Sequence, residues 1–520
     1  RYPPFIYIPH SFPLSLHPSV SHTPVPMRDD QHETVASSPA SQTSIAPLVV
    51  TKKTEWRSIF VAALITFLCA VENSIMGIAA WPYMKTLDAE ATTSFFGLLT
   101  GCVKATHAMF ILVFAAWSYK QKVIKYPIII GRLVSICGCI LFLFIEIVPD
   151  HRRYYILISN VLFGIGLSSP TLLRGYIAAK SAPEDRTSAY ALVGTANVLA
   201  VITAPAVQLA FSPLKYPGVP LLPFLHIHIY SAPLWFILGA NLIAIVFMVT
   251  CFRDPEPESK VKKAKEGLEK REGDSWLSFL ANWLQMQLVC LKSSPFSWSL
   301  VGVIFAQKMV GATTVSALTV ISAPIMMSIF AMSGEETTVT LSASQMFVGG
   351  LALSFSAMLT IRCISTRISS RVMFIIGSLS IIAIYIANYP YPVHDRLLSP
   401  YNETLRLGCN SAEYQWCTTA SAPLFWPWIA GFVVITGLCI PAMAISLDAL
   451  YSKILGNIDQ NLMQGFFSVI DDVALLIGSS GATLIFSSFG LGAMWISNTV
   501  ILALTAVLWI ANWKRLESHD

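Results

Sequence analysis

Residues 57–80 read RSIFVAALITFLCAVENSIMGIAA, a long apolar run that contains the single carboxylate of Glu72. About 20 consecutive apolar residues in a helix cross the hydrocarbon core of a bilayer. This stretch therefore predicts a transmembrane helix, and the rest of the chain divides by the same pattern.

Eleven further apolar runs follow, each bounded by charged residues or by Pro and Gly, and a charged interval separates the first six runs from the last six. The twelve runs lie at residues 57–80, 94–117, 127–148, 154–179, 188–212, 230–251, 297–322, 338–360, 370–389, 422–446, 462–487 and 490–511. The sequence thus predicts an all-α polytopic membrane protein with 12 transmembrane helices in two six-helix halves.

The composition of the chain supports this class. Hydrophobic residues make up 54% of the 520 residues and charged residues 12%, whereas soluble globular proteins carry about 25% charged residues. Twelve spans of about 20 residues need roughly 240 positions, which this apolar content can fill. Composition excludes the secreted, fibrous and disordered classes, and the net charge of +5 is informative only once the basic residues are sorted by side.

The two halves are expected at residues 56–252 and 296–511, joined by residues 253–295. The joining segment mixes Lys and Arg with acidic residues, which is typical of a solvated cytosolic linker. Within it, the apolar stretch 276–291 is too short to span a bilayer and predicts a helix lying in the membrane interface. A duplicated six-plus-six chain is typical of secondary transporters, which bind cargo near the midplane between their halves.

Basic residues gather on the side of the membrane that holds both chain ends. The opposite side has only six Lys and Arg residues, namely Lys85, Arg152, Arg153, Lys215, Arg396 and Arg406. Because Lys and Arg favour cytoplasmic loops, both termini are predicted to be cytosolic, including the tail at residues 512–520.

The loop at residues 390–421 is predicted to be the longest one on the lumenal side. It contains the sequon Asn402-Glu403-Thr404, the acceptor pattern for an N-linked glycan. Of the ten cysteines, only Cys409 and Cys417 lie on this oxidising side. The pair predicts a local disulfide, with two free thiols as the alternative.

The amino end is predicted to be a disordered cytosolic tail over residues 1–55. Residues 1–26 are rich in proline and precede Met27, so we interpret them as sequence upstream of the native start. No cleavable signal peptide is expected before the first span.

Ionisable residues inside the spans are the main functional candidates, because each costs at least about 2.5 to 3.5 kcal/mol at the bilayer centre. Glu72 and Lys104 lie at similar depths, counting about 1.5 Å per residue, and predict one ion pair. Lys308 with Asp471 or Asp472 predicts a second pair. A structural role for both pairs and a role in permeation stay open as alternatives.

Two further candidates, His107 and Arg174, also have a structural and a functional interpretation. His107 in the second span is either a helix-packing residue or part of the pathway. Arg174 either snorkels toward the cytosol or contacts an anion. Lys104 and Lys308 place one positive charge near mid-depth in each half, which predicts anion permeation that changes with pH when neighbouring acids take up protons.

Several local motifs point to a known family. They are Trp56-Arg57-Ser58, Trp81-Pro82-Tyr83-Met84, Asp185-Arg186-Thr187-Ser188, Gln415-Trp416-Cys417 and Leu450-Tyr451-Ser452-Lys453-Ile454-Leu455-Gly456. Over residues 55–511 the chain resembles a lysosomal branch of the major facilitator superfamily. The resemblance implies the major facilitator fold, a lysosomal location and chloride permeation.

The chain departs from the general patterns of the superfamily at three places. Residues 117–122 keep basic charge but lack the aspartate of the gating signature between the second and third spans. Asn160 stands near the start of the fourth span, where the family often has arginine, and Ala204 precedes Pro205 where a glycine is usual. These differences argue against ordinary proton-coupled antiport and leave the fold intact.

Motifs for other chemistry are lacking. The sequence has no phosphate-binding glycine loop, HExxH pair or nucleophile elbow, so we expect no enzyme activity, catalytic residue, metal site or cofactor. Trp81, Trp426 and Trp428 fit an interfacial belt better than a nucleic-acid platform. The expected partners are membrane lipid and a small anionic or other small-molecule substrate, and no nucleic acid.

Two functions remain. The first is a major-facilitator-type transporter in an endolysosomal membrane that conducts or carries chloride or small organic anions in a pH-sensitive way. The alternative is a non-transporting membrane scaffold or receptor that retains the fold.

Overall fold

The computed structural model describes residues 54–121, 123–182, 185–222, 225–254, 278, 285, 297–360, 369–391, 398–402, 407–455 and 461–518. Every helix named below lies within residues 54–518. Most of the predicted amino-terminal tail lies outside the described residues. The predicted interfacial helix at residues 276–291 also lies outside them, apart from two isolated positions.

The first half of the chain consists of helices joined by short connections, with one small hairpin. The elements are α1 (Trp56–Leu87), α2 (Thr93–Gln121), α3 (Lys125–Leu143), α4 (Arg152–Ser168), α5 (Leu172–Lys180), α6 (Arg186–Ala210), β1 (Val219–Leu222), β2 (Leu225–Ile227) and α7 (Ala232–Thr250). A 3₁₀ turn at Ser169–Thr171, which contains Pro170, joins α4 to α5. β1 and β2 pair antiparallel, with Val219 opposite Ile227.

The second half is helical as well. Its elements are α10 (Trp298–Ser328), α11 (Gly334–Thr360), α13 (Ser370–Ala387), α14 (Phe425–Val434), α15 (Ile440–Leu455), α16 (Asn461–Ala511) and α17 (Trp513–Glu517). A π-helical turn at Ile435–Cys439 joins α14 to α15, so these two helices form one membrane crossing.

The predicted fold class is confirmed. The described residues contain 11 helices long and apolar enough to cross a bilayer. The last of them, α16, contains Gly490 with φ 80° and ψ −173°. This break falls at the first residue of the predicted run 490–511, directly after the run 462–487, so α16 supplies two crossings and the described part of the chain supplies twelve.

Gly490 suits this turn for two reasons. A φ of 80° lies in the region that side chains with a Cβ rarely adopt. A Cβ built at this position would also lie 2.9 Å from Cδ2 of Trp416, closer than packed side chains tolerate. The indole of Trp416 therefore covers the turn between the last two crossings.

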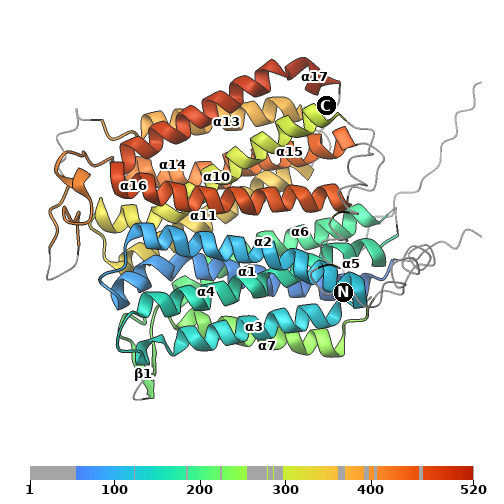
Figure 1. The fold of residues 1–520 in the computed structure, drawn as a ribbon, viewed down its shortest axis with the longest axis horizontal. Coiled ribbons are helices and arrows are strands. Elements are labelled where there is room, and N and C mark those ends of the chain that lie inside the picture. The colour runs from blue at the N-terminus through green and yellow to red at the C-terminus, as the bar shows by residue number, and fades with distance from the viewer. Residues whose placement is uncertain are drawn as a thin grey trace, which may run out of the picture. The chain divides into compact units, whose positions relative to one another are not determined.

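The connections at the two ends of the helix bundle differ in character. The β1–β2 hairpin and the segment after α13 lie at one end, and the labelled helices α5 and α17 lie at the other (Figure 1). We call the first the hairpin end and the second the α17 end.

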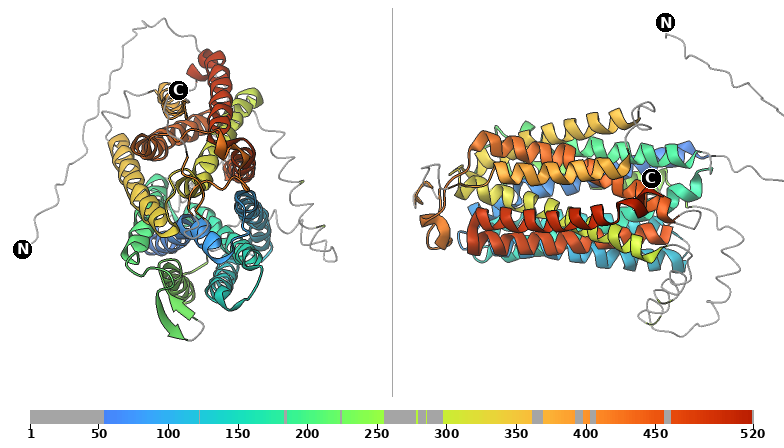
Figure 2. Two further views of the ribbon diagram at one scale, coloured as in Figure 1. Left: turned by 90° about the vertical axis from the view of Figure 1, so that its left-hand side faces the viewer. Right: turned by 90° about the horizontal axis from the view of Figure 1, so that it is seen from above.

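The two halves lie side by side, as the separate blue-to-green and yellow-to-red groups of helices show (Figure 2). The main helix pairs between them are α2 with α16 and α6 with α11, and α1 also packs on α11. Small residues bring α2 and α16 together, since a Cβ at Gly101 would lie 2.7 Å from Oγ of Ser480. Such small residues allow close backbone approach in membrane helix pairs.

Polar contacts and apolar packing close the hairpin end between the halves. Lys85 at the end of α1 forms a 3.0 Å ion pair with Glu413. The backbone N–H of Tyr216 donates to Glu335 at 2.8 Å. Ser94 contacts Ser487 at 3.0 Å.

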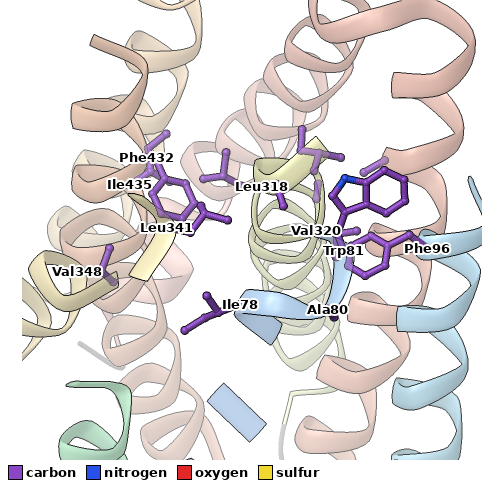
Figure 3. Close-up of a cluster of buried hydrophobic side chains, with 14 of the residues drawn as sticks. Ile78, Ala80, Trp81, Phe96, Leu318, Val320, Leu341, Val348, Phe432 and Ile435 are labelled. Atoms are coloured by element: carbon purple, nitrogen blue, oxygen red, sulfur yellow. The ribbon is translucent and has the colours of Figure 1, made fainter. Parts of the chain in front are cut away.

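The buried core crosses the boundary between the halves. Trp81 of α1 packs on Phe96 of α2 with ring centroids 5.4 Å apart, and both belong to the same buried cluster as Leu318 and Val320 of α10 (Figure 3). The expectation of an interfacial position is wrong for Trp81 and also for Trp428, because both side chains are buried in this core. Their indoles stabilise helix packing.

Candidate functional site

The deepest charged group of the first half is a fully buried ion pair. Arg132 of α3 donates through Nη1 to Oε2 of Glu72 at 2.8 Å, and both side chains are 1% exposed. Asn241 of α7 donates to the same carboxylate oxygen at 3.2 Å. Arg132 also donates to the carbonyl of Gly166. The network therefore ties α1, α3, α4 and α7 together.

The predicted pair between Glu72 and Lys104 is wrong. The two residues lie at similar depths, but depth does not determine which face of a helix a side chain occupies. Glu72 faces α3 and α7, where the guanidinium of Arg132 offers a fixed partner. Lys104 lies on the wall of a cavity.

That cavity lies among helices of the first half and has a volume of about 220 Å³. Its walls come from α1, α2, α6 and the α4–α5 crossing. The lining residues are Thr66, Cys69, Ala70, Asn73, Val103, Lys104, His107, Leu167, Pro170, Thr171, Leu173, Arg174, Val193 and Asn197. The α4–α5 wall places the cavity toward the α17 end, away from the closed hairpin end. It contains three predicted pathway residues, Lys104, His107 and Arg174.

Lys308 of α10 and Asp471 of α16 confirm the second predicted ion pair, with Nζ and Oδ1 3.3 Å apart. The ammonium group of Lys308 also lies 4.9 Å from the ring centroid of Phe467, within the range of a cation–π contact. Asp448 of α15 lies within electrostatic range of Lys308, Asp471 and Arg174. This second-half cation is therefore surrounded by carboxylates.

Asp472, which follows Asp471 in the sequence, has a different partner. Asp472 lies 2.9 Å from Nδ1 of His107 and is almost completely buried. His107 belongs to α2 and Asp472 to α16, so the contact joins the two halves. His107 is thus a polar bridge at the edge of the cavity, and sequence alone did not indicate its partner.

The hairpin end contains a cluster that sequence reasoning missed. Glu146 accepts hydrogen bonds from His228 at 3.1 Å, from His226 at 3.3 Å and from Tyr83 at 3.4 Å. The two histidines belong to the hairpin region, which lay outside the predicted spans. The cluster fixes the β1–β2 hairpin against α1 and the end of α3.

The long segment after α13 carries the predicted disulfide. Cys409 and Cys417 are bonded, with Cα atoms 5.8 Å apart. Asn402, the predicted glycan acceptor, is exposed on the same segment. Burial raises the pKa of Tyr414 well above its ordinary value, reinforced by the nearby Glu413, so this phenol stays neutral inside the segment.

Twelve crossings in two six-helix halves, with a polar cavity beside the boundary between them, define a multi-pass integral membrane protein of the secondary transporter class. The particular family follows from comparison. Residues 46–395 match the model of the Major Facilitator Superfamily, and the chain belongs to that family. The members of this family are transporters and not enzymes.

Known relatives agree with this assignment. The chain is similar to major facilitator superfamily domain-containing protein 8 of Xenopus laevis, at 23% identity over 511 residues, 91% of this chain and 94% of that protein. It shares a fold with the xylose transporter XylE from E. coli at a TM-score of 0.55 and 12% identity, covering 88% and 98% of the two chains. A bacterial homologue of the human lysosomal transporter Spinster, inward-facing and unoccupied, gives a TM-score of 0.56 at 14% identity, covering 90% and 98%.

Proposed function

We propose that this protein transports a small anionic solute across an endolysosomal membrane, along a pathway between its two halves. The observation that carries the proposal is the cavity of the first half. Its described lining contains the cations Lys104 and Arg174 and no carboxylate. A cavity lined by one sign of charge, with walls of low dielectric constant, concentrates ions of the opposite sign.

The orientation proposed from sequence gives the cavity a direction. With both termini cytosolic, the α17 end faces the cytosol and the closed hairpin end faces the lumen. The cavity then opens toward the cytosolic side. An exposed Asn402 and the Cys409–Cys417 disulfide on the opposite side suit an oxidising, glycan-bearing lumen.

The endolysosomal location and the anionic solute rest on different grounds. The location follows from the sequence resemblance to a lysosomal branch of the superfamily. The anionic solute follows from the charges of the cavity, and chloride is one candidate. Acids close to the cations, Asp448 and Asp471, change the local charge when they take up protons, which supports pH-sensitive transport.

The alternative function is a scaffold or receptor that does not transport. The observation in its favour is the segment at residues 117–122, which lacks the aspartate that the gating signature of the family carries. A chain that has lost this coupling element would keep the two-half fold without moving solute.

Flux in proteoliposomes separates the two functions. Purified protein is reconstituted, and uptake of chloride and of small organic anions is followed at acidic and at neutral lumenal pH. We expect protein-dependent anion flux that changes with pH and is absent from empty liposomes. Lys125→Gln, which removes a lysine at the start of α3 that lies outside the cavity and donates to the carbonyl of Val249 at 3.0 Å, serves as the charge-matched control. Absence of flux for every anion from folded protein would favour the scaffold.

A further inference from the structure

The cavity of the first half is unusual in how its polar groups are paired. Three of its polar side chains come from different helices, Asn73 of α1, Lys104 of α2 and Arg174 of α5. Within the described part of the chain, no hydrogen bond or ion pair reaches the side chains of Asn73 or Lys104. A cation and an amide without protein partners are available to a ligand.

Two other cations inside the described crossings have direct carboxylate partners. Arg132 is held by Glu72 at 2.8 Å, and Lys308 is held by Asp471 at 3.3 Å. Arg174 has only a longer-range electrostatic interaction with Asp448, across the boundary between the halves. Of these described cations, Lys104 and Arg174 are the ones without a direct carboxylate partner, and both line the cavity. This asymmetry differs from the sequence expectation of one equivalent lysine in each half.

The size of the cavity indicates what kind of anion it suits. A water molecule takes up about 30 Å³ of liquid, so a cavity of about 220 Å³ has room for roughly seven groups of that size. A monatomic anion is close to one such group and would contact only a small part of the lining. An organic anion fills more of this space.

The polar lining adds a second requirement. The amides of Asn73 and Asn197 and the hydroxyls of Thr66 and Thr171 also line the cavity. Thr66, Thr171 and Asn197 already donate to backbone carbonyls, so the amide of Asn73 is the group of this set most available to oxygen and nitrogen atoms of a ligand. The guanidinium of Arg174 matches carboxylate and phosphate oxygens in a paired geometry. A halide accepts hydrogen bonds as a single atom, so it does not match the paired geometry of the guanidinium.

We infer that this cavity binds a small organic anion through an oxyanion group, carboxylate or phosphate, held by Lys104 and Arg174 with Asn73 as a further hydrogen-bonding partner. The inference rests on the proposed function and assigns its substrate class. Lys308 lies in the other half beside its own carboxylates, so it is not part of this binding site.

Binding to the purified full-length protein in detergent tests the inference without requiring transport. Succinate is the carboxylate probe, glycerol 3-phosphate is the phosphate probe, glycerol is the neutral control and sodium chloride is the halide. Affinity is measured by calorimetry and by the ligand-induced rise in melting temperature. We expect at least one organic anion to bind, with glycerol inactive and chloride weaker at equal concentration.

Substitutions locate the site. Loss of a charge-assisted hydrogen bond weakens binding by about tenfold or more, so Lys104→Gln and Arg174→Gln should each reduce the affinity for the organic anion by that factor. Lys104→Arg keeps the charge and should retain most of the affinity, which guards against a folding artefact. Lys125→Gln, at the start of α3 and outside the cavity lining, should bind like the parent protein.

The outcomes separate this inference from the proposed function. Organic-anion binding that both Gln variants weaken supports the site, even if reconstituted protein shows no flux, a result that would instead remove the transport proposal. Chloride flux from protein that binds neither succinate nor glycerol 3-phosphate would overturn the site and leave transport standing. Equal binding of glycerol, or affinities unchanged in both Gln variants, would also overturn it.

Discussion

Nδ1 of His107 lies 2.9 Å from Oδ2 of Asp472, and this contact joins α2 of the first half to α16 of the second. A carboxylate accepts hydrogen bonds, so the imidazole donates. Transporters with two such halves expose their site alternately by rocking one half against the other. A polar bond across the boundary, beside the cavity, therefore stabilises one relative position of the halves.

Substitution of either partner should destabilise the protein to a similar extent. His107→Gln or Asp472→Asn removes a partly buried, charge-assisted hydrogen bond, which contributes about 1.5 to 3 kcal/mol. We expect a lower melting temperature for each single variant and little further loss in the double variant. Asp150→Asn, in an exposed loop, is the matched control. Fully additive losses would show that the two side chains act independently.

The buried pair of Glu72 and Arg132 makes a stronger prediction. Arg132→Met leaves a carboxylate of 1% exposure without its cation, and breaking a buried pair in this way costs about 3 to 5 kcal/mol. Expression and melting temperature should fall sharply. The double variant Glu72→Gln with Arg132→Met should recover much of the loss, because no buried charge then remains unpaired.

The control for this pair is Lys104→Met. Because Lys104 lies on the cavity wall, this variant should fold normally and should need no compensating change at Glu72. A large loss in Lys104→Met that Glu72→Gln repairs would contradict the pairing seen in the structure.

The sequence predicts the spans better than it predicts the site, and the reason is physical. Apolar length determines which residues cross the bilayer, and each predicted run corresponds to a described crossing. It does not determine which way a polar side chain faces around the helix axis. Glu72 was therefore assigned to Lys104 by depth alone. Arg132, inside the predicted run 127–148, was a signal that went unused, since a buried guanidinium requires an acid nearby.

Contacts between distant parts of the chain could not be predicted either, because the sequence does not show which way each side chain faces around its helix. The neighbouring acids Asp471 and Asp472 both lay within reach of Lys308 by depth, yet they face different partners on α10 and α2. The disulfide could be predicted because Cys409 and Cys417 are close in sequence and were both predicted on the lumenal side. The hydrogen bonds of Glu146 to the hairpin histidines required the fold of β1 and β2.

The proposed orientation predicts where each end of the protein is accessible. A tag at either terminus should be accessible to protease on the cytosolic side of sealed vesicles. Glycosidase should shift the mobility of the protein on a gel, and Asn402→Gln should abolish that shift, because Asn402 is exposed at the hairpin end. Tags protected inside intact vesicles would reverse the orientation.

The disulfide should stabilise the turn between the last two crossings. It encloses Trp416, whose indole covers Gly490, and closing a loop of this length contributes about 2 to 3 kcal/mol in the chain-entropy model. Cys409→Ser should lower the melting temperature and increase proteolysis of the segment, whereas Cys137→Ser, at an exposed free cysteine, should not. Non-reducing mass spectrometry should show linked Cys409 and Cys417 peptides in the parent, and free alkylation of both thiols would contradict the bond.

The pair of Lys308 and Asp471 decides between a structural and a permeation role for charge in the second half. Lys308→Gln alone removes the cation that pairs with Asp471 and lies near Asp448, so we expect reduced stability and reduced anion flux. If the lysine only neutralises these acids, the double variant Lys308→Gln with Asp471→Asn should recover both properties, because the charges are removed together. If the lysine itself attracts the passing anion, the double variant should recover its melting temperature while its flux stays low.

The structure favours the first result, since Lys308 is engaged by Asp471 at 3.3 Å and by the ring of Phe467 at 4.9 Å, whereas Lys104 faces the cavity. Flux and melting temperature measured on the same reconstituted samples distinguish the two roles, and a double variant that is stable but inactive would return Lys308 to the permeation pathway.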